Sequence, residues 1–254
     1  MIVFNADMDN TIIYSYKHHI GERKHCAERY QGREIAFMTD RTAELLKELS
    51  RKILIVPTTT RTREQYERID LGLGQMPYAL VCNGGVLLVN GEEDKSWYDA
   101  SREMIQDCQK ELEKGERLLE EEENRCLEVR NIRKLFLFSK SSQPEATIQR
   151  LSERLDTSLV DVFSHGIKVY AVPKKLSKGN AIKRFREVVK ADQVIAAGDS
   201  IFDISMLQYA DIAMAPYGLE IGEKPSGELV RIKETTLFSE GLLEYLNRRF
   251  PEAE

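Results

Sequence analysis

Two aspartates near the start of the chain are the residues whose types and spacing most suggest chemistry. The apolar run 2–6 leads directly to Asp7, and Asp9 follows two residues later. Because successive side chains of a strand point to opposite faces, residues i and i+2 share a face. One carboxylate can attack an electrophile and hold a cation while the other moves a proton. Acidic residues also cap helices and begin turns, so this spacing alone leaves a purely structural interpretation open.

Three further segments bring polar groups to the ends of apolar runs. The groups are hydroxyls after the run 53–58, a lysine in the first turn of a helix-like stretch, and two acids after the run 193–197. They are Thr58, Thr59, Thr60, Lys178, Asp199 and Asp203. In a parallel sheet such strand ends lie along one edge, where α/β proteins bind their ligands. A nucleophile, a hydroxyl, a lysine and an acidic pair together are what phosphoryl transfer requires.

With these motifs in this order, the chain resembles the haloacid dehalogenase superfamily of phosphohydrolases. Within it, the chain resembles the Cof-like branch that includes sucrose-phosphate phosphatase and relatives of phosphomannomutase. The resemblance covers nearly the whole chain. Residues 81–85 (Val-Cys-Asn-Gly-Gly) are similar to the family's junction between core and cap. Val172-Pro173 and residues 177–179 (Ser-Lys-Gly) are similar to its return from cap to core.

Periodicity and the resemblance together predict the α/β class, with a doubly wound parallel-sheet (Rossmann-like) core and an inserted α+β cap domain. Short apolar runs indicate strands buried on both faces, and apolar stripes indicate helices. The predicted strands are 2–6, 53–58, 78–82 and 193–197, and the predicted helices are 42–51, with Thr39 and Asp40 as candidate caps, and 180–190. We assign the core to residues 1–85 and 172–254, and the cap to residues 86–171.

The predicted cap has its own pattern of elements. A charged, helix-favouring stretch covers 97–123, and a further helix is expected at 144–155. Strand-like runs are at 134–139, 158–163 and 167–172, with His165 and Gly166 marking a hairpin. The segment 15–38 is longer than the family's usual link and carries three histidines and several basic residues. It is interpreted either as a solvated basic loop or as a flap that reads an anionic substrate. Its histidines lack a clean metal-ligand spacing.

The resemblance implies a role for each acidic residue. Asp7 would be the nucleophile that forms an aspartyl phosphate, and Asp9 the general acid that then activates water. Mg²⁺ would be held by Asp7, the backbone carbonyl of Asp9 and Asp199. Asp203, the fourth metal-site candidate, would either orient the metal's waters or bind Lys178.

Other positions would hold the substrate. Thr59, chosen because it lies two residues before Arg61, and Lys178 would bind phosphate oxygens and offset charge in the transition state. Thr60 is a further substrate-binding candidate. Arg61 could face the substrate or close an ion pair. Asn83 could contact the substrate or form an Asn-Gly turn.

The chain departs from the family pattern at two positions near the predicted site. Phe202 stands where relatives often have asparagine, so a hydrogen bond to the acidic cluster is either lost or supplied by Ser200. Asn10 stands where relatives often have glycine. Asparagine tolerates the turn conformations that glycine would adopt.

Composition bounds the classes of function. The chain has 254 residues, is 42% apolar and 31% charged, and carries a net charge of −5. This charge gives no pull toward nucleic acid or anionic membranes, and no apolar run approaches the roughly 20 residues of a membrane span. Four cysteines without a CxxC pair, and an amino terminus that enters the first strand directly, predict a cytoplasmic protein with reduced thiols. The oligomeric state is left open, and a monomer is compatible with the sequence.

The function predicted is a Mg²⁺-dependent phosphatase of a small phosphorylated metabolite, a sugar or polyol phosphate. Two alternatives stay open: a sugar phosphomutase using the same aspartyl-phosphate chemistry, and a non-catalytic binding or regulatory protein with the same fold. The set Asp7, Asp9, Lys178 and Asp199 argues against the second. The sequence does not name the substrate, because specificity depends on cap residues that only folding brings to the site.

Overall fold

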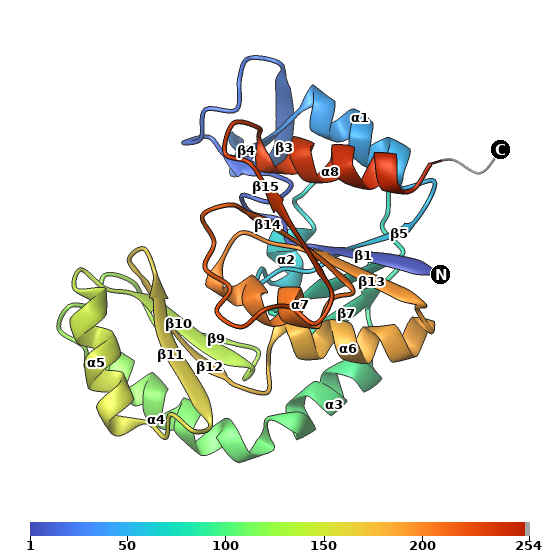
Figure 1. Ribbon diagram of the computed structural model, residues 1–254. Helices are drawn as coiled ribbons and strands as arrows, with labels where there is room; N and C mark the ends of the chain where they lie inside the picture. Colours follow the sequence, from blue (N-terminus) through green and yellow to red (C-terminus); the bar gives the residue numbers. More distant parts are fainter. Residues whose placement is uncertain (252–254) are drawn as a thin grey trace. The chain divides into compact units, whose positions relative to one another are not determined.

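The computed structural model describes residues 1–251, and the chain divides into two compact units (Figure 1). The first unit contains Met1–Asp94 and the segment from Lys178 onward, and the second contains Lys95–Ser177. The second unit is therefore an insertion in the sequence of the first. The domain bounds proposed from the sequence, 86–171 for the insertion, differ from these units at both ends.

A five-stranded parallel sheet forms the centre of the first unit, in the order β15-β14-β13-β1-β5. Its strands are β1 (Ile2–Ala6), β5 (Leu54–Pro57), β13 (Gln193–Ala197), β14 (Ile212–Pro216) and β15 (Glu228–Ile232). Strand β5, the next strand of this sheet after β1 in the sequence, lies on one side of β1. Strands β13, β14 and β15 follow one another on the other side. The strand order therefore reverses between β1 and β13, which is where sheets of this type bind ligands.

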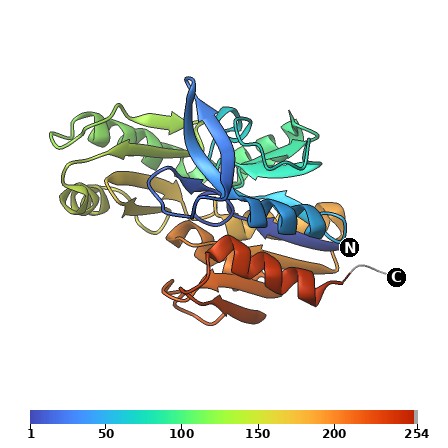
Figure 2. The ribbon, with the colours of Figure 1, turned by 90° about the horizontal axis from the view of Figure 1, so that it is seen from above.

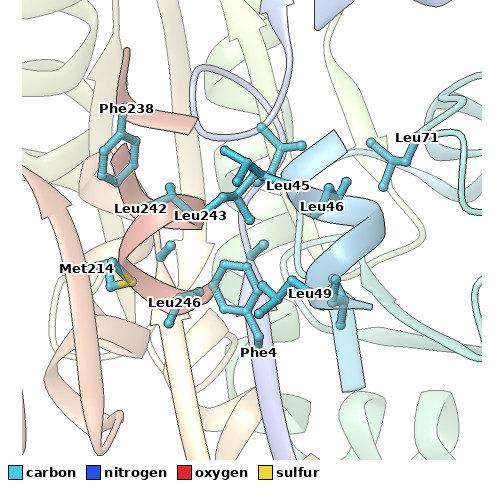
Figure 3. Packing of buried hydrophobic residues seen from close by; sticks show 14 of the residues in the cluster. Phe4, Leu45, Leu46, Leu49, Leu71, Met214, Phe238, Leu242, Leu243 and Leu246 are labelled. Atoms are coloured by element: carbon cyan, nitrogen blue, oxygen red, sulfur yellow. The ribbon is translucent and has the colours of Figure 1, made fainter. Parts of the chain in front are cut away.

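Two helices cover one face of this sheet, α1 (Asp40–Leu49) and α8 (Phe238–Arg249). Their leucines pack together with Phe4 of β1 and Met214 of β14 (Figure 3). Helix α1 begins after Thr39, whose side chain accepts a hydrogen bond from the Thr42 amide at 3.0 Å, so the predicted Thr39 cap is confirmed. The apolar spacing of both helices thus supplies the core that holds the sheet.

The opposite face is covered by α6 (Lys178–Val189) and the short α7 (Ile204–Tyr209), which follows the 3-10 turn η2 (Ile201–Asp203) (Figure 1). The predicted helix 180–190 is α6, which begins two residues earlier. Helices on both faces of a parallel sheet explain why β1 and β13 are buried along nearly their whole lengths. The predicted fold class is confirmed.

The segment 15–38 combines a loop at 16–23, mostly exposed as in the first interpretation, with paired strands that the sequence analysis did not predict. Strands β2 (Tyr14–Ser15), β3 (Lys24–Tyr30) and β4 (Arg33–Thr39) form an antiparallel sheet in the order β2-β4-β3. Figure 2 shows the β3–β4 hairpin, in blue, extending away from α1. The pairing of β3 with β4 is irregular around Glu28, where a β-bulge shifts the register.

A second small sheet lies between the 58–61 loop and the insertion in the sequence. It contains β6 (Tyr78–Val81), β7 (Val86–Val89) and β8 (Glu92–Glu93), all antiparallel, and α2 (Arg63–Tyr66) precedes it. Thr58 forms an isolated parallel bridge with Leu80 of β6. The 58–61 loop is thereby fixed between the central sheet and this smaller one.

The inserted unit is an α+β unit with its own antiparallel sheet and its own helices. Its antiparallel sheet has the order β11-β12-β10-β9, and its strands are β9 (Arg130–Ile132), β10 (Phe136–Lys140), β11 (Val160–His165) and β12 (Lys168–Pro173). One face of the sheet packs on α4 (Gln109–Glu120) and α5 (Pro144–Arg154) through a cluster that includes Leu112 and Leu151. Gly166 turns the predicted hairpin with a φ of 57°.

The helical stretch 97–123 is not continuous, which corrects the prediction there. Helix α3 (Lys95–Met104) ends before Ile105, and a 3-10 turn, η1 (Gln106–Cys108), leads into α4. Ile105 and Cys108 are both buried, so the break places two apolar side chains in the unit's interior. Within residues 1–251 no helix has the length and apolarity that crossing a bilayer requires.

Candidate active site

The ends of β1 and β13 set the position of the acidic residues. Ala6 and Ala197 are register partners, and the Asp7 amide donates to the Ala197 carbonyl at 2.9 Å. Asp7 therefore leaves the sheet beside the segment that carries Asp199. The two apolar runs recognised in the sequence thus deliver their acids to one edge, as expected for parallel neighbours.

A buried lysine joins the acids at this edge. The Lys178 Nζ lies 2.5 Å from Asp7 Oδ1 and 2.6 Å from Asp203 Oδ1, and Lys178 is 1% exposed. One ligand atom each of Asp7, Asp199 and Asp203 lies within 4.8 Å of the others. Four residues predicted for the site are therefore in one cluster, although Lys178 and Asp7 are 171 residues apart in the sequence.

Asp203 is held more completely than its neighbours. Its Oδ2 accepts from the Asp199 amide at 3.1 Å, the Ser200 amide at 2.9 Å and the Ser200 hydroxyl at 2.8 Å. Of the two roles considered for Asp203, the bond to Lys178 is therefore present. The hydroxyl of Ser200 supplies the hydrogen bond that Phe202 does not provide.

Burial and repulsion shape the protonation of the cluster. Burial raises the pKa of Asp7 well above its ordinary value, against the attraction of Lys178, and Asp203 adds to the rise. Burial and then Asp203 raise the pKa of Asp199 to about 6. For Lys178 burial lowers the pKa, but Asp203 and Asp7 outweigh it and raise the pKa overall. Crowded carboxylates that outnumber their one cation fit a divalent metal ion with a preference for oxygen ligands.

Asp9 belongs to a second group of charges. The chain turns after β1 with Asn10 at a φ of 59°, the left-handed conformation expected of this asparagine. The Asp9 side chain is 51% exposed, and both of its oxygens accept from Arg61, from Nε and Nη2, at 2.7 Å each. Arg61 therefore forms the ion pair that was one of its two predicted roles, and its substrate contact stays a prediction.

The remaining substrate-binding candidates lie in two connected loops. The Thr58 amide donates to the Ala6 carbonyl at 2.8 Å, so the 58–61 loop begins beside Asp7. Thr59 is buried, and its hydroxyl accepts from the Arg61 amide at 3.2 Å, whereas Thr60 is partly exposed. Asn83 has a φ of 58° and its amide donates to the Thr59 carbonyl at 3.0 Å. Asn83 thus forms the predicted turn, and its contact with substrate is untested.

Glu28 is a charged residue near the site that sequence reasoning missed. It is 2% exposed, and its carboxylate bonds to Arg61 Nη1 at 2.9 Å and to Arg68 Nε at 2.9 Å. The bonds to Asp9 and Glu28 raise the pKa of Arg61, although burial alone lowers it. The sequence offered little signal, because Glu28 precedes the exposed Arg29 and Tyr30 in a segment interpreted as a loop or a flap.

Close packing at the start of α6 fixes Lys178, which gives a first prediction. A Cβ on Gly179 would lie 2.4 Å from the Ser205 carbonyl oxygen, so Gly179→Ala must displace α6 from α7. We expect a loss of about 1–3 kcal/mol in the free energy of unfolding, measured by urea titration. Gly218→Ala is the matched control, because its Cβ would meet only Glu234 Oε1, at 3.6 Å. Equal stability of the two variants would contradict the close approach.

Comparisons with known proteins identify the family of this chain. The family model described as haloacid dehalogenase-like hydrolase matches residues 89–215, which is half of the chain. The chain therefore belongs to the haloacid dehalogenase-like hydrolases, as the sequence motifs predict. No curated protein matches the chain by sequence.

Solved structures extend the likeness over the whole chain. The sucrose-phosphatase from Synechocystis sp. PCC6803, solved with sucrose and phosphate, has 15% identity and a TM-score of 0.62, with 99% of each chain covered. The phosphatase BT1666 from Bacteroides thetaiotaomicron has 16% identity and a TM-score of 0.59, covering 98% of this chain and 94% of that one. The subclass IIB sugar phosphatase BT4131 has 12% identity and a TM-score of 0.61, covering 98% and 99%. At these identities the likeness concerns the fold.

Proposed function

We propose that the chain is a Mg²⁺-dependent phosphatase that hydrolyses a small sugar or polyol phosphate through an aspartyl-phosphate intermediate. The observation that carries the proposal is the buried cluster in which Lys178 bonds to Asp7 beside Asp199 and Asp203. It combines a candidate nucleophile, a cation for phosphate oxygens and a set of metal ligands. The sugar class is supported by the names of the similar solved structures, a sucrose-phosphatase and a sugar phosphatase.

Asp7 would attack the phosphorus of the substrate, and the bond to the leaving alcohol would break. Lys178 orients the Asp7 carboxylate through the 2.5 Å bond and favours its ionised form. The same ammonium, with Thr59, would offset charge on the phosphoryl oxygens. Asp9 would protonate the leaving oxygen and later take a proton from the water that hydrolyses the aspartyl phosphate.

The acidic residues differ in their capacity to hold the metal. Asp7 and Asp199 would each contribute one carboxylate oxygen, and the Asp9 carbonyl is the third proposed ligand. Asp203 already accepts from Lys178 and from three donors at residues 199 and 200, so we assign it chiefly to positioning these groups. When bound, Mg²⁺ would offset the charge that accumulates on the phosphoryl group.

A screen of phosphorylated metabolites tests the proposed function. Purified protein with Mg²⁺ is expected to release inorganic phosphate from sugar or polyol phosphates more efficiently than from nucleotides or phosphoproteins. The measurement is kcat/KM for each compound. Absence of phosphate release from every phosphomonoester would reject the proposal. Transfer of the phosphoryl group to a second sugar without release of phosphate would favour the phosphomutase alternative.

The proposed role of Asp9 gives a separate prediction. We expect Asp9→Asn to lower kcat/KM for an alkyl phosphate by about 10²-fold or more, because its poor leaving group needs a proton. The variant should still release one equivalent of nitrophenolate from p-nitrophenyl phosphate, measured as a pre-steady-state burst. Asp70→Asn is the control, because the exposed side chain of Asp70 accepts from the Gly72 amide and an amide oxygen can replace it. Wild-type turnover of alkyl phosphates by Asp9→Asn would remove Asp9 from the mechanism.

A further inference from the structure

The β3–β4 hairpin, which is part of the first unit, carries one buried carboxylate, that of Glu28. Glu28 lies at the β-bulge of β3, where the register against β4 shifts on both sides of it. Bulges reorient side chains and are frequent next to active sites. Glu28 follows the buried Ala27 and precedes the exposed Arg29 and Tyr30, and its side chain is only 1% exposed. The irregularity therefore directs a charged side chain into the interior. Burial of a charge is unfavourable unless the charge is paired, so the partners of Glu28 must offset this cost.

Those partners are two arginines with different environments. Arg68 Nε bonds to Glu28 Oε1 at 2.9 Å, and its guanidinium lies over the Tyr30 ring, 4.6 Å from the centroid. Arg61 Nη1 bonds to Glu28 Oε2 at 2.9 Å and approaches the Gln65 carbonyl at 3.4 Å. Arg68 thus links Glu28 to its own hairpin, whereas Arg61 links it to the site.

One guanidinium, that of Arg61, contacts both Glu28 and Asp9. Its Nε and Nη2 form the bidentate pair with the Asp9 carboxylate, while Nη1 is held by Glu28. Because a guanidinium is planar and its donors have fixed directions, holding Nη1 fixes the plane of the other two donors. In this plane Nε and Nη2 face the two oxygens of the half-exposed Asp9 carboxylate.

A purely structural role for Glu28 is the competing explanation. The hairpin is already attached to the core by other bonds, since the Asp70 amide donates to the Ala27 carbonyl at 2.8 Å and Glu28 forms a backbone bridge with Ile69. Arg68 alone would pair the Glu28 charge. The additional bond from Glu28 to Arg61 is the one that attachment of the hairpin does not explain.

We propose that Glu28 is a positioning residue for Asp9, acting through Arg61. The inference rests on the proposed phosphatase function. In the first chemical step the Asp7–phosphorus bond forms, the bond from phosphorus to the leaving oxygen breaks, and a proton passes from Asp9 to that oxygen. Glu28 keeps the Arg61 charge paired and its plane fixed when one Asp9 oxygen turns to the leaving group. Glu28 therefore affects the rate most for substrates whose leaving group needs a proton.

The test is the dependence of kcat/KM on the leaving group in Glu28→Gln. We expect a loss of about 10-fold or more on sugar and alkyl phosphates, mainly in kcat, and less than about 3-fold on p-nitrophenyl phosphate. Arg61→Lys, which keeps the charge but loses the bidentate geometry, should show the same pattern. Glu34→Gln is the matched control on the same hairpin, because Glu34 forms an exposed pair with Arg29 and should keep wild-type rates.

Each other outcome has a definite meaning. Equal losses of Glu28→Gln on both classes of substrate, or no loss on either, would overturn the inference while the wild-type protein remains a phosphatase. If Glu28→Gln does not fold, as judged by its thermal unfolding, Glu28→Asp keeps the charge but withdraws it from Arg61. The same leaving-group pattern is then required of it. A wild-type protein without any phosphatase activity would reject the proposed function itself.

Discussion

Asp7→Asn is expected to abolish phosphate release, by on the order of 10⁴–10⁶-fold in kcat, because an amide is a poor nucleophile at phosphorus. No phosphoenzyme should form. The measurement is trapping of labelled phosphate on acid-quenched protein, together with steady-state turnover on a sugar phosphate and on p-nitrophenyl phosphate. Unlike Asp9→Asn, the Asp7→Asn variant should lose activity on both substrates equally, because hydrolysis of both requires the attacking carboxylate.

Two controls make the Asp7 result interpretable. Asp40→Asn changes an exposed aspartate in the first turn of α1 and should retain both activities. A thermal unfolding transition as sharp as that of the wild type would show that Asp7→Asn is folded. Retained turnover in folded Asp7→Asn, or a phosphoenzyme labelled at another residue, would contradict the assignment of Asp7.

Removal of divalent metal is expected to reduce phosphate release to background, and Mg²⁺ should restore it. Binding can also be followed without activity, because an ion that binds only the folded protein raises its unfolding temperature. At a concentration 100-fold above Kd the stabilisation is about 2.7 kcal/mol. We expect Mg²⁺ to raise the unfolding temperature of the wild type, and Asp199→Ala to lose most of this shift. Ca²⁺ should inhibit, because it disturbs the tight octahedral geometry that Mg²⁺ prefers.

The metal experiment has a matched control at the other end of the same strand. Asp192 lies just before β13, its side chain is 84% exposed, and it pairs with the amino terminus. Asp192→Ala should therefore keep the full Mg²⁺-dependent shift. Full activity after exhaustive chelation, or an unchanged shift in Asp199→Ala, would remove the metal from this site.

The sequence predicted three strands of the central sheet, β1, β5 and β13, and the acidic cluster, because these are determined by short patterns, whereas β14 and β15 were not predicted. Residues 2–6 and 193–197 are apolar except for Asn5 and Gln193, which is typical of parallel strands buried on both faces. Since parallel strands end at one edge, the positions of Asp7 and Asp199 follow from the strands themselves. Lys178 was found because the segment that opens α6 resembles a family motif, and its buried bond to Asp7 follows from the fold.

The hairpin and its buried glutamate were not predictable in the same way. In β3 the bulge interrupts the alternation of buried and exposed residues that identifies a strand. Glu28 is buried only because Arg61 and Arg68, from a different part of the sequence, supply its partners. The break between α3 and α4 also lacks a local signal, since neither proline nor glycine marks Ile105, and packing within the inserted unit determines it.

The pairing of β1 with β13 has a consequence for biosynthesis. Asp7 leaves the ribosome early, but Lys178, 171 residues later, is its partner, and at 5–20 residues per second that interval takes about 10–30 s. The insertion emerges during this interval and can complete its own sheet from consecutive residues, whereas the parallel sheet must wait for distant strands. A nascent chain therefore carries an incomplete set of the proposed site residues until translation has passed β13. Premature termination before that strand yields a fragment that lacks Asp199 and Asp203.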